Sequence, residues 1–213
     1  MLQIRVFFKK KNAAKYISHL DLQRTVMRGL MRSNLKIAYS EGFNPHIKLA
    51  FAMPLSVFQE SDYEIFDIQT LTDYSKDEIK SALIKAFPPD IMIFNVAEPI
   101  EKLAALKTAD YDITLFTSIS ALDISAALDG DIIVEKRTKS GIKAMDISSL
   151  IYKKSIEKVG DFTILHLNTA CNPVDYLNVA YVVTYLKEKF GDNICTSEIN
   201  RTMLRDVKGN PLA

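Results

Sequence analysis

The chain has 213 residues, of which 48% are hydrophobic and 25% are charged, and its formal net charge is +1. This composition excludes an intrinsically disordered protein, because enough apolar residues are present to bury a core. No stretch approaches the ~20 apolar residues that cross a bilayer, and no secretory signal is recognised, so no membrane role is expected. Two cysteines 24 positions apart make no disulfide framework, and we therefore predict a cytoplasmic protein.

The first half of the chain alternates strand and helix patterns. Ser18 and Asp21 have the spacing of a capping box at the start of the first helix, and Pro88 stops the second. The order strand, helix, strand, strand, helix, strand is typical of a ferredoxin-like fold. Strands are expected at 2–8, 37–40, 48–53, 63–69 and 91–96, and helices at 18–33 and 76–87.

The second half approximates a degenerate repeat of the first. Strands are expected at 111–116, 131–137, 142–147 and 162–167, and helices at 120–128 and 174–190, with the tail from 194 unassigned. We therefore predict an α+β protein with two ferredoxin-like halves, 1–97 and 110–213, joined by a connector at 98–109. A single α+β domain with one continuous sheet is the alternative.

The near-zero net charge hides an uneven distribution. Residues 1–48 hold ten Lys and Arg against two Asp and Glu, a charge of +8. Residues 49–135 carry −11 and residues 136–213 carry +4. Such a basic block attracts a polyanion or an acidic partner, although solvated surface lysines are the simpler explanation.

Three arginines form a stripe on the first expected helix. Arg24, Arg28 and Arg32 recur every four residues, which places them on one side, roughly 6 Å apart along the axis. The preceding loop adds Lys9, Lys10 and Lys11. These side chains are candidates for binding phosphates.

Two of the three histidines flank this region. His19 lies at the expected helix start, and His46 follows a loop with Gly42 and Pro45. If that loop folds over the helix start, one cleft brings together the candidate site residues His19, Tyr39, Glu41, His46 and Lys48. This cleft would bind phosphate, with acid–base catalysis as a further option. Alternatively, His19 caps the helix and His46 is an ordinary surface residue.

A second basic element lies in the other half. Lys136, Arg137, Lys139 and Lys143 surround a Ser-Gly turn, which suits the tip of a hairpin that contacts phosphates. The alternative is a soluble hairpin whose edge strands carry charges that prevent aggregation.

Two segments resemble a known family. The runs Ile17–Leu22 and Ala38–His46, together with the patch Val134–Gly141 and Asp146, are similar to the radical SAM-linked proteins, a family of unknown function. The resemblance extends from residue 1 to about residue 190. Members of that family occur alone or fused behind a radical SAM enzyme, often encoded near a ribonuclease of the E/G type. The resemblance thus implies a role in RNA processing or modification, with a radical SAM enzyme as partner.

The chain itself is not expected to be the radical enzyme. Such an enzyme needs three clustered cysteines to hold a [4Fe–4S] centre, whereas Cys171 and Cys195 are far apart in sequence. No Gly-rich nucleotide loop, nucleophile elbow or zinc spacing is found either, so no cofactor and no metal are expected.

These observations predict an RNA-binding accessory module, acting with a radical SAM enzyme on tRNA or rRNA and without activity of its own. One alternative is a metal-independent ribonuclease or RNA-modifying enzyme that uses His19 or His46 with Tyr39, Glu41 or Lys48. Another is a protein–protein adaptor. The candidate RNA-binding residues are Lys9, Lys10, Lys11, Arg24, Arg28, Arg32, Tyr39, Phe43, His46, Lys48, Lys136, Arg137, Lys139 and Lys143.

Overall fold

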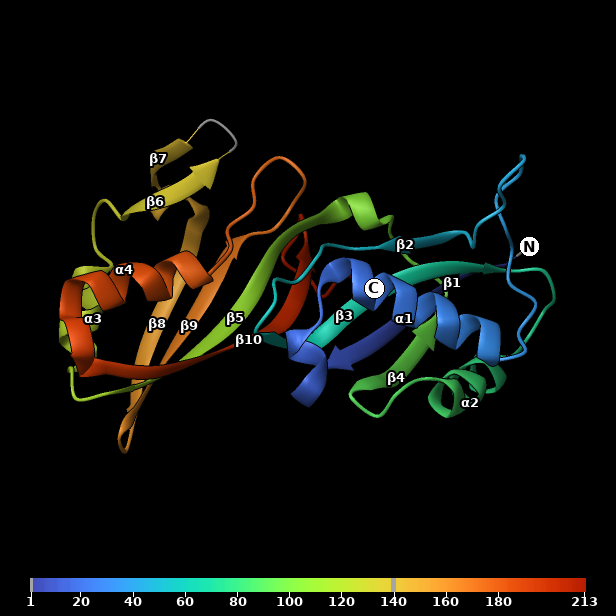
Figure 1. The fold of residues 1–213 in the computed structure, drawn as a ribbon, viewed down its shortest axis with the longest axis horizontal. Helices are drawn as coiled ribbons and strands as arrows, with labels where there is room; N and C mark the ends of the chain where they lie inside the picture. The colour runs from blue at the N-terminus through green and yellow to red at the C-terminus, as the bar shows by residue number, and fades with distance from the viewer. Residues whose placement is uncertain (1, 139–140) are drawn as a thin grey trace. The chain divides into compact units, whose positions relative to one another are not determined.

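The computed structural model describes residues 2–138 and 141–213 and has an α+β fold (Figure 1). The chain divides into two units. Unit 1 runs to Leu106 and also includes Met203–Ala213, and unit 2 comprises Lys107–Thr202. The boundary at Leu106 lies inside the expected connector. The return of the terminal segment to unit 1 differs from the expected assignment of that segment to the second half.

Unit 1 contains a sheet with two covering helices. Its elements are β1 (Leu2–Lys10), α1 (His19–Arg32), β2 (Leu49–Phe51), β3 (Gln59–Thr70), α2 (Lys76–Ala86) and β4 (Ile91–Ala97). The strands pair in the order β4-β1-β3, and β2 pairs with β3. All three pairings are antiparallel, with Val6 opposite both Phe66 and Val96.

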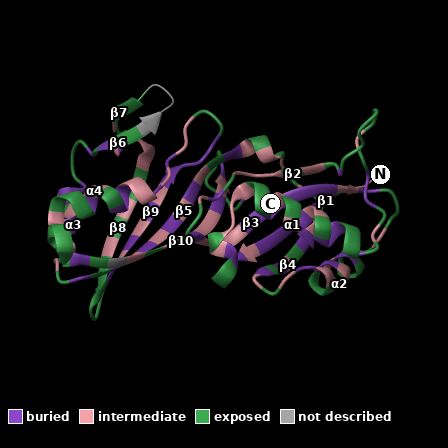
Figure 2. Cartoon of the chain, in the orientation of Figure 1, coloured by how far each residue is buried: buried purple, intermediate pink, exposed green. Residues whose placement is uncertain are grey.

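The helices of unit 1 cover one face of this sheet. Leu22, Val26 and Leu30 recur on one side of α1 and are buried. They share a core with Phe8 of β1, Phe66 of β3 and residues of α2. β1 is purple along most of its length in Figure 2, because the sheet is covered there. Residues 4–8 of β1 are all buried, so both faces of the strand are covered although its first residues alternate between apolar and polar.

The prediction of a strand at 37–40 is wrong. The segment forms single bridges only, from Ile37 to Thr70 and from Tyr39 to Ile47. Glu41–Pro45 then project as an exposed loop, in which Gly42 has a φ of 117° that favours glycine. Breakers at Gly42 and Pro45 leave too few residues for a strand ladder.

The terminal segment of the described chain packs within unit 1. Leu212 is fully buried, and its carbonyl accepts a hydrogen bond from the Tyr63 hydroxyl (3.2 Å). The Ala213 carbonyl accepts from Arg5 (2.7 Å) and from the backbone N–H of Ile100 (3.1 Å). Arg5 is buried and also makes two 2.8 Å bonds to the Asp67 carboxylate.

The remaining strands of the same eight-stranded sheet, and a separate two-stranded hairpin, belong to unit 2. Its elements are β5 (Leu106–Thr117), α3 (Ala121–Ala127), β6 (Ile133–Thr138), β7 (Gly141–Asp146), β8 (Ile151–Val159), β9 (Phe162–Ala170), α4 (Ala180–Phe190) and β10 (Ile194–Asp206), which ends in unit 1. The sheet strands pair in the order β10-β5-β9-β8, and β6 pairs only with β7. The expected hairpin is confirmed.

Helix α4 is shorter than the expected 174–190. The Asn172 side chain accepts bonds from the N–H groups of Val174 and Asp175, and that of Asn178 accepts from Ala180. These local bonds hold the first residues as a loop, so that the helix begins at Ala180. Among the described residues, no helix is both long and apolar enough to cross a membrane.

Candidate functional site

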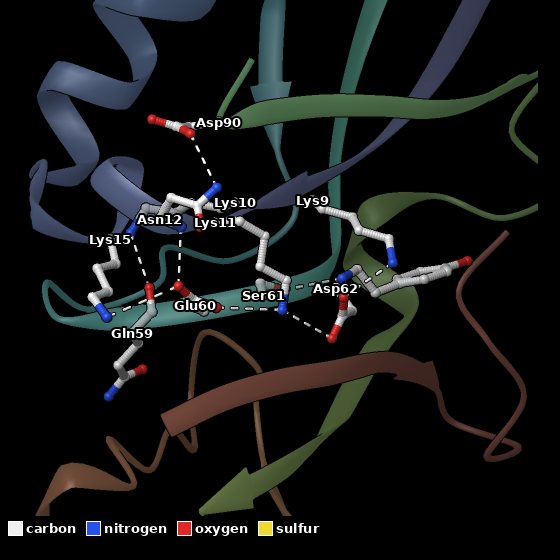
Figure 3. Close-up of polar contacts among 11 residues, drawn as sticks. Lys9, Lys10, Lys11, Asn12, Lys15, Gln59, Glu60, Ser61, Asp62 and Asp90 are labelled. Atoms are coloured by element: carbon white, nitrogen blue, oxygen red, sulfur yellow. Dashed lines mark hydrogen bonds and ion pairs between the residues drawn. The ribbon is translucent and has the colours of Figure 1, made fainter. Parts of the chain in front are cut away.

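The lysines before α1 are paired with acids of β3 (Figure 3). Lys9 and Lys11 each lie 3.1 Å from Asp62. Lys11 also lies 3.5 Å from Glu60, and Lys15 approaches the same carboxylate at 4.0 Å. Two carboxylates therefore offset much of the positive charge that the sequence places here.

Lys10 is in a different position from its neighbours. Its side chain is only 1% exposed, and its ammonium donates to the Gln59 carbonyl (3.3 Å). A phosphate cannot approach this group from solvent. The Lys10 side chain instead joins β1 to β3 through its bond to Gln59. Of the three adjacent lysines, Lys9 is the most exposed, with 42% of its side chain accessible.

The arginine stripe is exposed on α1 as expected. The Ser18 hydroxyl caps the helix by accepting from the Asp21 N–H (3.2 Å). The same hydroxyl donates to the Asp21 carboxylate and, with Arg24, lowers the pKa of Asp21. In the described chain, Asp21 is the one acid that forms an ion pair with the stripe, through Arg24 at 3.0 Å. Arg28 is exposed to solvent.

A groove of about 700 Å³ lies beside the end of this stripe, between α1 and α2. Arg32 and Lys85 supply its cations, Glu78 supplies one carboxylate, and Ser33, Asn34 and Ser81 supply neutral polar groups. The Arg32 guanidinium donates to the Ala86 carbonyl at 2.8 Å, which holds its side chain across the groove. The groove lies at the C-terminal ends of α1 and α2, so any affinity for a phosphate would come from the Arg32 and Lys85 side chains and not from the helix termini.

The loop at 40–46 presents aromatic side chains to solvent. Phe43 is fully exposed, and Tyr39 is 48% exposed. The His46 N–H donates to the Ser40 hydroxyl (3.1 Å), and the His46 Nδ1 lies 3.0 Å from the same oxygen. Lys48 is exposed just after this turn. The loop base is therefore fixed by hydrogen bonds, while its tip carries an uncovered ring.

His19 and His46 do not share a cleft. His19 packs edge-on against Phe51, with ring centroids 5.3 Å apart, near the end of α1 that follows Lys15. Lys15 bonds to Phe58, just before β3 begins, whereas the loop with His46 leaves from Ala38, which bonds to Gln69 at the other end of β3. The expected cleft of His19, Tyr39, Glu41, His46 and Lys48 is thus absent, because the loop does not fold over the helix start.

The basic hairpin of unit 2 is formed by β6 and β7. Lys136 and Lys143 lie opposite each other in the ladder, and both are exposed. Arg137 lies in β6, but its side chain is outside the described part of the structure, and Lys139 is outside the described residues altogether. Two like charges directly opposite destabilise a ladder, so this pair favours an anionic partner.

Sequence reasoning missed a polar cluster on the sheet of unit 2. His166 Nδ1 lies 2.7 Å from Asp112, and its Nε2 lies 3.6 Å from Glu157. The hydrogen bond that His166 donates to the Asp112 carboxylate is the main cause that raises the pKa of His166. Next to it, the Asn168 amide donates to Asp110 (2.6 Å). Polar residues at every second position of 108–114 and at 166 and 168 were the available signal, but their pairing depends on strand register.

The polar cluster lines a groove of about 460 Å³. Its walls come from Asp110, Asp112, Lys153, Lys154, Ser155, His166, Asn168 and Thr202, among others. Within residues 2–138 and 141–213, no group of three or more His, Cys, Asp or Glu is arranged to hold a metal ion. The groove therefore offers hydrogen-bonding and charged groups for a polar ligand.

Comparison with solved structures gives two matches of low similarity. A chain in the crystal structure of a Cbf5-Nop10-Gar1 complex matches with a TM-score of 0.49 and 9% identity, covering 93% of this chain and 48% of that one. This chain thus spans about half the length of that one. An unknown protein from Galdieria sulphuraria matches with a TM-score of 0.28 and 14% identity, covering 94% of this chain and 96% of that one.

Sequence comparison places the chain in a family. No curated protein matches it. A family model does match residues 3–178, a range that includes the arginine stripe, the exposed loop, the hairpin and the His166 cluster. The chain therefore belongs to DUF2344, a family of uncharacterized proteins conserved in bacteria.

Proposed function

We propose that this chain is an RNA-binding accessory protein that acts with a radical SAM enzyme in the modification or processing of tRNA or rRNA. The link to the radical enzyme comes from the sequence resemblance. The RNA-binding role is supported by one observation above the others, the arginine stripe of α1. Arg24, Arg28 and Arg32 are exposed at four-residue spacing, beside a groove that holds Lys85.

The chemistry of these groups fits an RNA backbone. Guanidinium groups bind phosphate oxygens in a bidentate manner and are always charged. Three of them at roughly 6 Å intervals follow a line of phosphates, and the groove at Arg32 and Lys85 provides a further contact. This arrangement carries affinity without selecting a sequence.

The exposed loop supplies a different type of contact. Unpaired RNA bases stack on aromatic side chains, and Phe43 presents its whole ring to solvent. Tyr39 and His46 lie at the base of the same loop. The ring of Phe43 is therefore open to stacking by a base.

We also propose that both units are ferredoxin-like. Unit 1 has the strand order β4-β1-β3-β2, and the sheet of unit 2 has the corresponding order β10-β5-β9-β8. In this interpretation the β6–β7 hairpin is an insertion after α3. The repeat would give the protein two comparable sets of strands on which to bind an extended ligand.

The test is a binding measurement across a salt series. Purified protein is titrated with fluorescent RNA from cells or with synthetic oligonucleotides at several salt concentrations. The double variant Arg28→Glu and Arg32→Glu should bind at least tenfold more weakly and with a shallower salt slope. The matched control is Lys187→Glu with Lys189→Glu, two exposed lysines of α4. Equal losses in both variants, or no binding by the unmodified protein at low salt, would contradict the proposal.

Catalysis by the histidines has less support. A ribonuclease that uses two histidines needs both within reach of one phosphate, whereas here His19 packs on Phe51 and His46 bonds within its own loop. An adaptor role for the acidic middle segment has no particular contact in its favour. Binding of RNA thus remains the function that the exposed groups support best.

A further inference from the structure

The outward face of the unit 2 sheet carries an ordered set of side chains. On β5, Asp110, Asp112, Thr114 and Phe116 occupy alternate positions, while the residues between them are buried. Their partners on β9 are Asn168, His166, Ile164 and Phe162 in the same order. Paired residues of adjacent strands share a face, so polar pairs and an aromatic pair lie along one surface.

The aromatic pair lies at one end of this face. Phe116 and Phe162 are 40% and 48% exposed, and their rings meet edge to face with centroids 5.6 Å apart. Val159 of β8 lies opposite Phe162 and is 51% exposed. Large apolar rings on an uncovered sheet face indicate a surface that meets a ligand.

The polar groove lies about four residues along the same strands, which is roughly 13 Å. It contains both donors and acceptors. The carboxylates of Asp110 and Asp112 face Asn168 and His166, and Lys153 and Thr202 lie at the walls. Its lining holds two carboxylates, two lysines and one histidine, so the charges are nearly balanced.

We infer that this face binds unpaired nucleotides, with a base stacked on Phe116 and Phe162 and another base hydrogen-bonded in the groove beside Asp112 and His166. This inference rests on the proposed RNA-binding function and names the form of RNA that is bound. Balanced charge and mixed donors and acceptors suit the uncharged edge of a nucleobase. The distance between the two parts calls for an oligonucleotide rather than a single nucleotide.

Duplex RNA does not fit these features. In an A-form helix the bases are stacked on one another and the side chains of a protein cannot reach their faces. Stacking on protein aromatic groups therefore requires single-stranded segments, loops or bulges. The Asp112–His166 pair adds base discrimination, because a carboxylate accepts hydrogen bonds from amino groups of bases whereas an imidazole N–H donates.

The experiment compares a fluorescent ten-nucleotide single strand with a blunt duplex of the same sequence, on the full chain. The double variant Phe116→Leu and Phe162→Leu keeps apolar bulk but removes the rings. We expect it to bind the single strand about tenfold more weakly, in line with the energy of base stacking. The control is Tyr152→Leu, which removes a ring that is 45% exposed but lies outside the groove and the Phe116–Phe162 pair.

A second variant tests the groove separately. Asp112→Asn should make the affinities for strands of adenine, guanine, cytosine or uracil more alike. Its overall affinity for RNA should fall by less than that of the ring variant. Titration of the unmodified protein with the preferred strand should shift the His166 imidazole signals in NMR spectra. Circular dichroism and thermal melting establish that each variant is folded.

The outcomes distinguish the inference from the function on which it rests. If the unmodified protein binds no RNA, the proposed function itself fails. If Arg28→Glu with Arg32→Glu weakens binding but the ring variant behaves as the unmodified protein does, only the present inference is overturned. A ring variant that changes the oligomeric state in size-exclusion chromatography, with RNA binding intact, also overturns it and identifies the face as a protein interface.

Discussion

A Cβ atom on Gly29 would lie 2.5 Å from Cε2 of the Phe87 ring, so α1 approaches the end of α2 as closely as glycine allows. The ring cannot move away easily, because it is 8% exposed and stacks on Phe66 with centroids 6.2 Å apart. Glycine within a helix is normally unfavourable, and here its small size offsets that cost.

Gly29→Ala should therefore destabilise unit 1 despite the better helix propensity of alanine. We expect a loss of about 1–3 kcal/mol in the free energy of unfolding, as for other overpacked cores. The measurement is urea denaturation followed by circular dichroism. Phe87→Leu in the same chain should recover part of the loss, and strictly additive effects of the two substitutions would contradict the close contact.

The buried Arg5–Asp67 pair gives a second prediction. Both residues lie in the sheet of unit 1, and Arg5 is completely buried. Asp67→Asn leaves the guanidinium without its charged partner, so unfolding free energy should fall by about 3–5 kcal/mol. The exposed ion pair Lys76–Glu98 is the control, and Glu98→Gln should cost less than about 1 kcal/mol. Similar losses for the two substitutions would be inconsistent with the burial of Arg5.

Stability should depend on pH through His166. Its folded-state pKa is raised, chiefly by the hydrogen bond to Asp112 and against a smaller effect of burial. Its contribution is therefore fully present below the unfolded-state pKa of about 6.5 and is lost as pH rises through the higher folded-state pKa. The difference in unfolding free energy between the unmodified protein and His166→Gln should be larger at pH 6 than at pH 9. The Asp112–His166 pair is partly exposed, so this difference should change by less than about 1 kcal/mol between the two pH values. A larger difference at pH 9 than at pH 6 would contradict a raised pKa for His166.

The paired lysines should contribute little to RNA binding. Lys9→Ala with Lys11→Ala removes two charges that Asp62 and Glu60 already offset. We expect less than a threefold loss of RNA affinity, compared with a loss of tenfold or more for the arginine variant. Conversely, Asp62→Asn with Glu60→Gln should free the lysines and strengthen binding at low salt. Equal losses for the lysine and arginine variants would show that the ion pairs open in the complex.

Local patterns gave a reliable prediction of the first helix. Ser18 and Asp21 identified the start of α1, and the four-residue spacing of Leu22, Val26 and Leu30 identified its buried side. These features depend on neighbours within one or two turns, which a single sequence records directly. The same reasoning placed Arg28 on the exposed side of the helix.

Long-range pairing was not accessible in the same way. Whether the loop of His46 reaches His19 depends on which end of β3 receives Ala38, and no local pattern specifies that. The acids that pair with Lys9 and Lys11 lie about fifty residues further along the chain. Likewise, Asp112 meets His166 only because β5 and β9 adopt one register among several.

The path of the last described residues has a practical consequence. Unit 1 is assembled from two pieces of chain, and Arg5, Tyr63 and Ile100 all bond to the second piece. In the order of the chain, unit 2 is an insertion between the two segments of unit 1. A fragment that stops at Leu106 would leave Arg5 without one of its acceptors and β3 without its β10 neighbour. To express unit 1 alone, residues 107–202 should therefore be deleted and Leu106 joined to Met203 by a linker. Truncation of the chain at its midpoint would remove the second segment of unit 1.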